Sequence, residues 1–352
     1  MSQSLAIAVA LGILIFFWKS RANYHALPSL PTLDNPNPPS VTVVIPARDE
    51  ASTIARAVLS FPNTPVLVID DASSDSTAEI AARAGARVIP APSLPSGALG
   101  KPNACQAGAD ASSSDWLLFV DADTWFDPRF LPSLLAYATR ENLDAASLFP
   151  QQHCLALAEQ TLLPYAFALY FTGVDARAVN SPRSPESLGN GQCFLFRRAV
   201  YQAIGGHRAV SNTVIEDIAL ARLLQQNGFR YRVLRAESLA HVRMYSSLAA
   251  IFRGFEKNAF RFLTVNPITA AQVILASILA TSWLPVLLWA ALDRQWTSAA
   301  LLFLSLPAVL LPLYGKRIWL VPAAVYGFQL IALSSLAASL TGRKVIWKGR
   351  RV

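Results

Sequence analysis

The chain has few charged residues and few cysteines, and each shortage argues against a class of protein. Only 15% of its 352 residues are charged, whereas 53% are hydrophobic. This balance suits a soluble domain joined to membrane segments better than a plain globular protein. The three cysteines, Cys105, Cys154 and Cys193, are odd in number and form no Cys-x-x-Cys pair. They argue against a zinc site or a disulfide framework, and indicate free thiols in a reducing compartment.

Two recognition signatures are also missing. No Gly-x-Gly-x-x-Gly follows the first predicted strand, which disfavours a nicotinamide-dependent oxidoreductase. The formal net charge is +8, but no basic helix or aromatic-interleaved patch accompanies it, so we expect no nucleic-acid partner. Part of this charge flanks apolar runs, where it fits the negatively charged cytoplasmic leaflet of a bilayer.

The N-terminal apolar run, residues 5–18, is short for a membrane span unless residues 1–4 are included. It lacks a positively charged start and a clear cleavage site. These features favour an anchor over residues 1–20, with its N-terminus outside, over a cleaved signal peptide. The Pro- and Asn-rich stretch that follows, within residues 21–40, is typical of an extended linker.

Two or three further transmembrane helices are expected within residues 266–342. The runs 268–292 and 319–340 are long enough to span, while 299–313 is short and contains two prolines. Three crossings from a cytoplasmic domain would place the basic tail, residues 343–352, outside, against the positive-inside tendency. The number of spans and the side of the tail therefore stay open at this point.

An amphipathic helix is predicted over residues 246–265. Apolar residues recur at helical spacing from Leu248 to Leu263, and charged residues occupy the other side. The apolar set is Leu248, Ile251, Phe252, Phe255, Ala259, Phe262 and Leu263, and the charged set is Arg253, Glu256, Lys257 and Arg261. Such a helix lies in a membrane interface, although an ordinary core-facing helix has the same pattern.

Between the linker and this helix, residues 41–245 alternate between strand and helix patterns, as in a doubly wound α/β domain. Strands are expected at 41–46, 66–70, 87–90, 116–121, 144–149, 191–197 and 230–234. Helices are expected at 51–60, 76–85, 101–111, 155–172, 198–204 and 217–227. Ser76 and Glu79 have the spacing of a capping box at the second of these helices.

The strand over residues 117–120 ends in the carboxylates of Asp121 and Asp123. The carboxyl ends of strands border the ligand crevice of an open α/β sheet. A divalent cation shared with substrate phosphates suits such a pair. Alone, the pair is better explained as a polar turn. However, two earlier strands, ending near Pro46 and Asp70, also finish in polar turns at this edge.

Together these stretches closely resemble the family 2 glycosyltransferases of the GT-A fold, over residues 41–262. The first turn matches Pro-x-Arg-Asp-Glu at 46–50, and the second matches Asp-Asp-x-Ser-x-Asp at 70–75. Asp121-Ala122-Asp123 matches the family's Asp-x-Asp motif, and Glu216-Asp217 matches its general-base motif. The resemblance implies a GT-A catalytic domain that uses a nucleotide-sugar donor and Mg²⁺ or Mn²⁺.

The resemblance also implies the donor site. Asp70 or Asp71 would accept from the uracil edge of a UDP-sugar, and Asp121 would hold the ribose or share the metal. Lys101 would face the nucleotide, although a helix start with a solvated lysine explains it too. The implied donor-binding residues are Pro46, Ala47, Arg48, Glu50, Asp70, Asp71, Lys101, Asp121, Ala122 and Asp123.

The catalytic base implied by the resemblance is Asp217, which would deprotonate the acceptor hydroxyl in a single inverting displacement. The alternative is that Glu216 and Asp217 are only the acidic first turn of a helix. Gly191 and Gln192, with Glu216, would shape the acceptor pocket. Asp123 and His241 would hold the metal.

One departure from the family pattern reduces the range of acceptors that we expect. Processive members carry Gln-x-x-Arg-Trp near the interface helix, whereas residues 253–258 here read Arg-Gly-Phe-Glu-Lys-Asn. This region is more similar to the membrane glycosyltransferases of carotenoid-ester (diaponeurosporenoate) synthesis. We therefore expect one sugar to be moved to a membrane lipid by an enzyme of a bacterial inner or cell membrane, facing the cytoplasm. The alternatives are a polyprenyl-phosphate acceptor and a non-catalytic sugar-nucleotide-binding protein.

Overall fold

The computed structural model describes residues 3–34, 37–181, 186–263, 266–343, 346–347 and 350–351. The chain forms two compact units. The sheet unit consists of Leu27–His153 and Arg177–Met244, and the helical unit of Met1–Ala26, Cys154–Ala176 and Tyr245–Val352. The chain therefore leaves the sheet unit after His153 and re-enters it at Arg177.

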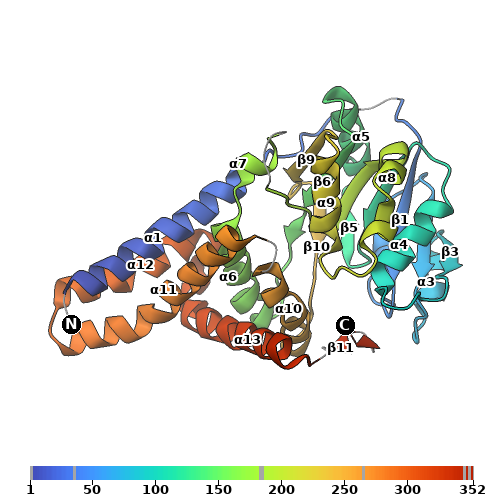
Figure 1. Ribbon diagram of the computed structural model, residues 1–352. Coiled ribbons are helices and arrows are strands. Elements are labelled where there is room, and N and C mark those ends of the chain that lie inside the picture. The colour runs from blue at the N-terminus through green and yellow to red at the C-terminus, as the bar shows by residue number, and fades with distance from the viewer. Residues whose placement is uncertain are drawn as a thin grey trace. The chain divides into compact units, whose positions relative to one another are not determined.

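A seven-stranded sheet forms the sheet unit, with the strand order β3-β2-β1-β4-β8-β6-β9 (Figure 1). Only β8 runs antiparallel to its neighbours, β4 and β6, while the other pairs are parallel. The predicted mixed α/β sheet is confirmed. Its strands are β1 (Val41–Ala47), β2 (Val66–Asp70), β3 (Arg87–Pro90), β4 (Trp116–Val120), β6 (Ala145–Phe149), β8 (Cys193–Arg197) and β9 (Tyr231–Arg235).

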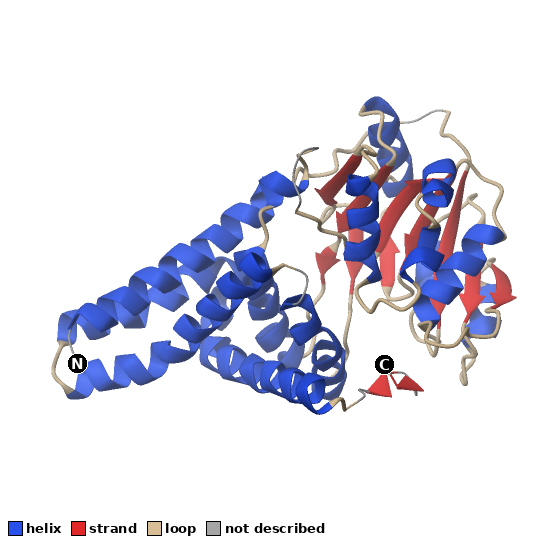
Figure 2. Ribbon diagram, viewed as in Figure 1, coloured by secondary structure: helices blue, strands red, loops and turns tan. Residues whose placement is uncertain are grey.

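Helices cover both faces of this sheet (Figure 2), which is why its central strands are apolar throughout instead of alternating. Val43 and Ile45 belong to a core that includes Leu134 of α5. Val44 faces the opposite side, where a Cβ added to Gly108 of α4 would lie 2.3 Å from its Cγ1. These helices are α2 (Ile54–Leu59), α3 (Thr77–Arg83), α4 (Gly100–Asp110), α5 (Phe130–Arg140), α8 (Arg198–Ala203) and α9 (Glu216–Gln226), with the 3-10 helix η1 (Gly206–Val210). The short helix α7 (Ala176–Val179) begins where the chain re-enters the sheet unit.

A second sheet of three short strands was not predicted. It has the order β5-β10-β7, with β5 at Thr124–Phe126, β10 at Ala240–Val242 and β7 at Gln151–Gln152. Strands of two or three residues are too short to show a period of two in the sequence. This small sheet joins the segment after Asp123 to the segment around His241.

Two local predictions need correction. Ser76 does precede α3, but its side chain makes no capping hydrogen bond. Asp75 caps the helix instead, because its Oδ1 accepts from the Thr77 backbone N–H at 3.0 Å. The predicted anchor at 1–20 and linker at 21–40 also need correction: α1 (Gln3–Ala26) continues into the linker range, and Arg235 of β9 donates its N–H to Pro28 O at 2.9 Å and accepts from the Leu30 N–H at 2.7 Å.

The described part of the helical unit contains six long helices: α1 (Gln3–Ala26), α6 (Leu157–Gly173), α10 (Leu248–Leu263), α11 (Pro267–Leu292), α12 (Trp296–Tyr314) and α13 (Val321–Thr341). A 3-10 helix, η2 (Gly315–Leu320), joins the last two. In the described residues, three helical stretches are long and apolar enough to cross a membrane: Gln3–Ala26, Pro267–Leu292 and Trp296–Thr341. They indicate that the protein associates with membranes.

Helix α6 falls inside the predicted range 41–245, yet it packs with the apolar helices. Ser20 of α1 donates its hydroxyl to Ala168 O at 2.6 Å, and Tyr314 of α12 donates to Thr161 O at 2.6 Å. Pairing polar side chains with carbonyls inside a bundle is a common way to join helices in a membrane. The catalytic-domain range therefore includes one helix of the other unit.

The amphipathic pattern of α10 is only partly as predicted. Leu248 is 58% exposed, whereas Glu256, predicted on the polar side, is 7% exposed. Glu256 Oε1 accepts from Ser334 Oγ at 2.5 Å and from Arg343 Nη2 at 2.7 Å. Glu256 thus faces α13 because a serine and an arginine satisfy its charge there. The side chains predicted at 261–263 lie outside the described residues.

Candidate active site

The two carboxylates of the predicted Asp-x-Asp motif follow β4 in a tight turn. Both the backbone N–H and the hydroxyl of Thr124 donate to Asp121 O, at 3.2 and 2.6 Å. Ala122, between the aspartates, is 3% exposed. The turn is therefore anchored in the core while it carries Asp121 and Asp123 at its edges.

The antiparallel strand β8 brings the predicted acceptor loop to this turn. Because β8 runs opposite to β4, with Cys193 beside Val120, its N-terminal side lies at the carboxyl end of β4. Gln192 O accepts from the Asp121 N–H at 3.3 Å. The Gly191-Gln192 loop and Asp121 are thus direct neighbours, although 70 residues separate them in sequence.

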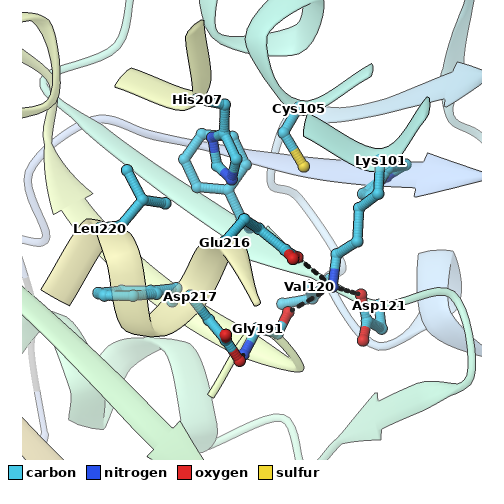
Figure 3. Close-up of a pocket in the computed structure, with 12 residues that line it drawn as sticks. Lys101, Cys105, Val120, Asp121, Gly191, His207, Glu216, Asp217 and Leu220 are labelled. Carbon is cyan, nitrogen blue, oxygen red and sulfur yellow. Dashed lines mark hydrogen bonds and ion pairs between the residues drawn. The ribbon is translucent and has the colours of Figure 1, made fainter. Parts of the chain in front are cut away.

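Lys101 contacts three of the predicted site residues (Figure 3). Its Nζ lies 2.8 Å from Asp121 Oδ1 and 3.1 Å from Glu216 Oε1, and it donates to Gly191 O at 3.4 Å. Burial opposes the charge of Lys101, but the carboxylates of Asp121 and Glu216 outweigh it and hold the lysine pKa well above its usual value. Lys101 is an ion-paired side chain and not a solvated lysine at a helix start.

Asp217, the predicted base, is held by backbone groups at the start of α9. Its Oδ2 accepts from the Gly191 N–H at 2.9 Å and its Oδ1 from the Ile218 N–H at 2.8 Å. Burial and the neighbouring Glu216 charge raise its pKa to about 6. The close packing requires a glycine, since a Cβ on Gly189 would lie 2.3 Å from Asp217 O.

These groups line one pocket. Its walls are formed by Pro46, Lys101, Cys105, Phe119, Val120, Asp121, Gly191, Phe194, His207, Glu216, Asp217 and Leu220. At the back, the Tyr201 hydroxyl lies 2.8 Å from His207 Nδ1 and accepts from the His207 N–H at 3.0 Å. Burial, with the Lys101 charge, lowers the His207 pKa to about 3, so this imidazole is neutral.

The first two strand-end turns lie side by side, because Ala47 pairs with Asp70 in the parallel register of β1 and β2. Arg48 Nη1 donates to Asp71 O at 2.7 Å, and the Asp71 N–H donates to Ala47 O at 2.8 Å. Asp70 Oδ1 is buried and, in the described part of the chain, has no hydrogen-bond partner. A nucleobase N–H would supply the missing donor.

Glu50 completes these two turns. Its backbone N–H donates to Thr77 Oγ1 at 2.7 Å, which fixes the first turn against the start of α3. Asp49 has a φ of 52°, in the left-handed region, and its Oδ1 accepts from the Ser74 N–H at 2.7 Å. The turns therefore form one rigid wall beside the pocket.

The predicted metal ligands, Asp123 and His241, lie on adjacent strand segments. The Arg243 N–H donates to Asp123 O at 3.4 Å, and His241 pairs with Trp125 in the small sheet. The His241 ring stacks on Trp125 with centroids 5.5 Å apart, and its Nδ1 lies 3.2 Å from His153 Nε2. Among the described residues, the hydrogen bond of the His241 ring is at Nδ1, so its Nε2 edge could face a ligand.

Within the described ranges, no three His, Cys, Asp or Glu side chains gather as in a protein-only metal site. A cation shared with a diphosphate needs only one or two protein ligands. The carboxylate and imidazole of Asp123 and His241 fit that second kind of site, because hard oxygen and neutral nitrogen donors both bind Mn²⁺.

Comparison with solved structures identifies the fold of the sheet unit. A mannosyltransferase from Pyrobaculum calidifontis, solved in complex with GDP-mannose and Mn²⁺, superposes with a TM-score of 0.62 over 98% of this chain and 100% of its own, at 16% identity. The sheet unit thus has the GT-A fold, with long apolar helices before and after it.

Sequence comparison adds the family: residues 42–205 match the family described as glycosyl transferase family 2. The 4,4'-diaponeurosporenoate glycosyltransferase of Staphylococcus haemolyticus is 27% identical over 216 residues, 59% of this chain and 57% of the relative. That of Staphylococcus aureus strain USA300 is 25% identical over 254 residues, 68% of this chain and 64% of the relative. The chain is a distant homologue of these enzymes, and spans less than two thirds of their length.

The structure gathers Lys101, Asp121, Glu216, Asp217 and Gly191 in one pocket and places the 46–50 and 70–71 turns beside it. Sequence reasoning did not single out His207, which lines the pocket, or its partner Tyr201, because a buried histidine after two glycines carries no recognisable spacing. It also missed Gln152, whose short strand has no pattern of its own.

Proposed function

We propose that this chain is an inverting glycosyltransferase that moves one sugar from a nucleotide-sugar donor, UDP-linked, to a membrane lipid. Family membership supports sugar transfer, and the two adjoining turns with the buried Asp70 oxygen support a nucleotide site. The lipid acceptor is supported by the three long apolar helices and by the names of the carotenoid-ester relatives.

In the proposed reaction Asp217 is the general base. The acceptor oxygen bonds to the anomeric carbon as its proton passes to an Asp217 carboxylate oxygen. The bond from the anomeric carbon to the diphosphate breaks, and its electron pair leaves with the diphosphate. Because attack and departure occur on opposite sides, the anomeric configuration inverts. A base with a pKa near 6 is ionised at neutral pH and remains basic enough to take the proton.

Lys101 and Glu216 would position the reacting groups. Lys101 Nζ bridges Asp121 and Glu216. It would therefore set the position of the donor diphosphate relative to the base, Asp217. Glu216 sits beside Asp217 and would face the acceptor together with Gly191 and Gln192. Pro46, Ala47, Arg48 and Glu50, with Asp71, would enclose the base and ribose.

Asp123 and His241 would hold the Mg²⁺ or Mn²⁺, with Asp121 sharing it or holding the ribose. When bound, the cation would neutralise charge that develops on the leaving diphosphate. The solved neighbour contains Mn²⁺ with its GDP-mannose.

The acceptor would come from a bilayer, with the sheet unit on the cytoplasmic side of a bacterial inner or cell membrane. The buried thiols of Cys105 and Cys193, which form no disulfide in the described residues, support a reducing compartment. The three apolar helical stretches support integral membrane attachment.

The observation that carries the proposal is the Asp217 carboxylate, held by two backbone N–H groups in the pocket that contains Lys101 and Asp121. The test incubates the purified full chain with bacterial lipid extract and a panel of labelled nucleotide sugars, with and without EDTA. We expect one labelled sugar to enter the organic phase, and EDTA to abolish the transfer.

Asp217→Asn separates the possible acceptors. With a hydroxyl acceptor the change should lower kcat by a factor of about 100 or more, whereas an ionised polyprenyl phosphate needs no strong base and should keep much of its rate. The matched control is Asp110→Asn, whose side chain is 57% exposed at the end of α4. Absence of label in the organic phase with every donor refutes the lipid acceptor, and transfer that survives EDTA refutes the metal.

A further inference from the structure

Three carboxamide side chains form a chain beside the proposed active site. Gln192 Oε1 accepts from Asn190 Nδ2 at 3.2 Å and from Gln152 Nε2 at 3.3 Å. Gln192 is 8% exposed, and its backbone carbonyl accepts from the Asp121 N–H. The Gln152 amide is therefore linked through one side chain to the turn that carries the Asp-x-Asp motif.

The far end of this chain is fixed to the large sheet. Asn190 donates its Nδ2 to Leu148 O at 3.0 Å, and its N–H to Ser147 Oγ at 2.7 Å. Its Oδ1 accepts from the Gln192 N–H at 3.2 Å. Because each bond fixes the orientation of the next amide, Gln192 presents its carbonyl, and not its NH₂ group, to Gln152.

Gln152 then has one polar atom left over. Its Oε1 is buried and finds no hydrogen-bond donor among the residues that the structure describes. The small sheet explains the burial: Gln152 pairs with Val242, which pairs with Thr124, and both of these neighbours are 0% exposed. A buried carbonyl without a donor is unfavourable, and proteins rarely leave one except where a ligand completes it.

We propose that Gln152 determines sugar specificity by accepting a hydrogen bond from one hydroxyl of the sugar carried by the donor. This deepens the proposed function and rests on it. One hydrogen of the Gln152 Nε2 is donated to Gln192 Oε1, and the buried atom without a partner among the described residues is the carbonyl oxygen, which accepts; a neutral hydroxyl is the donor that suits a neutral carboxamide. The link through Gln192 to Asp121 places this acceptor near the donor side of the pocket.

The consequence is discrimination between sugars that differ at one carbon. A sugar with that hydroxyl satisfies the Gln152 carbonyl, while its deoxy analogue or epimer leaves the carbonyl buried and unpaired. Sites that hydrogen-bond a substrate hydroxyl reject analogues without it for this reason. We expect the deoxy analogue at one ring position, and only there, to react at least about tenfold more slowly.

The test measures hydrolysis of the donor without any lipid, so that only donor contacts contribute. Wild type is assayed with its preferred nucleotide sugar and with the deoxy analogues at each ring position. Gln152→Met keeps the length of the side chain and removes the carbonyl. Gln151→Met is the matched control, because the neighbouring Gln151 side chain is exposed and, among the described residues, its Nε2 bonds only to Gln152 O.

For Gln152→Met we expect kcat/KM for the parent sugar to fall about tenfold and that for one deoxy analogue to stay unchanged. Their ratio then approaches one, whereas Gln151→Met keeps the wild-type ratio. Binding of the nucleoside diphosphate alone should be unchanged in both variants. If Gln152→Met fails to fold, Gln152→Asn, which withdraws the carbonyl by one methylene, should give the same loss of discrimination.

Three results would overturn this assignment. An equal loss with every sugar indicates a structural role, and no loss with any sugar indicates that water satisfies the carbonyl. A loss that appears only when lipid is added assigns Gln152 to the acceptor. If wild type neither hydrolyses nor transfers from any donor, the proposed function itself fails, and the assignment with it.

Discussion

The Asp217 pKa of about 6 predicts a rate profile that rises with pH. The base must be ionised to accept a proton, so kcat/KM for the donor should climb tenfold per pH unit below 6 and level off above it. About a tenth of the free enzyme would be active at pH 5 and about nine tenths at pH 7. His207, with its pKa near 3, stays neutral throughout this window.

The same geometry predicts that two substitutions move the rising limb of the pH–rate profile in opposite directions. The Glu216 charge raises the Asp217 pKa, so Glu216→Gln should shift the limb to lower pH. The Lys101 charge lowers the Asp217 pKa, so Lys101→Met should shift the limb to higher pH. A displacement of about one pH unit corresponds to about 1.4 kcal/mol of interaction with the carboxylate.

The assay is donor hydrolysis and lipid transfer between pH 4.5 and 8.5, each at constant ionic strength and with thermal melting recorded at every pH. Both variants are expected to have lower plateaus, since both residues line the pocket, and the position of the limb is therefore the diagnostic quantity. The reasoning is refuted if the limb stays in place in both variants, or if Asp217→Asn retains the wild-type limb.

Three other predictions follow from the structure. Asp123→Asn should weaken cation-dependent donor binding about tenfold or more in calorimetry with Mn²⁺, while Asp110→Asn should not; equal binding in both would remove Asp123 from the metal site. Gly189→Ala should lower the melting temperature more than Gly191→Ala, because its Cβ would lie 2.3 Å from the Asp217 backbone oxygen, whereas that of Gly191 would approach the end of the Lys101 side chain, Nζ, at 2.9 Å and Glu216 Oε1 at 3.4 Å; the reverse order would contradict the packing described. Finally, the full chain should stay in the membrane fraction through an alkaline carbonate wash, and release by that wash would contradict spanning by the three apolar helical stretches.

The parts of the fold that the sequence predicted are those with strong local patterns. The strands at Val41–Ala47, Val66–Asp70 and Trp116–Val120 are continuous apolar runs that end in polar turns, so their type and edge were readable. The parallel order then brings those ends together, which is why Asp70 and Asp121 could be assigned to one side of one sheet. Asp217, at the start of a helix, was assigned through the family resemblance.

The features that were not predicted depend on tertiary contacts. Glu256 has the helical spacing of a polar face, and only Ser334 and Arg343, far along the chain, make its burial favourable. Helix α6 has apolar residues that would suit a soluble core equally well. Its sequence pattern therefore did not predict that it packs with the long apolar helices. Asp75 replaced Ser76 as the cap because it also accepts from the Ala51 N–H, in another segment.

The position of α6 has a practical consequence for producing the catalytic part alone. Trimming both ends of the chain, for instance to residues 27–244, would still leave an apolar helix in the middle of the product, at 154–176. Without α1 and α11 to α13, that helix would expose the surface that they cover, and the trimmed protein should aggregate. A soluble version therefore requires excision of residues 154–176 and a polar bridge from His153 to Arg177. A protein that can be studied without detergent therefore requires a deletion inside the gene as well as removal of both ends.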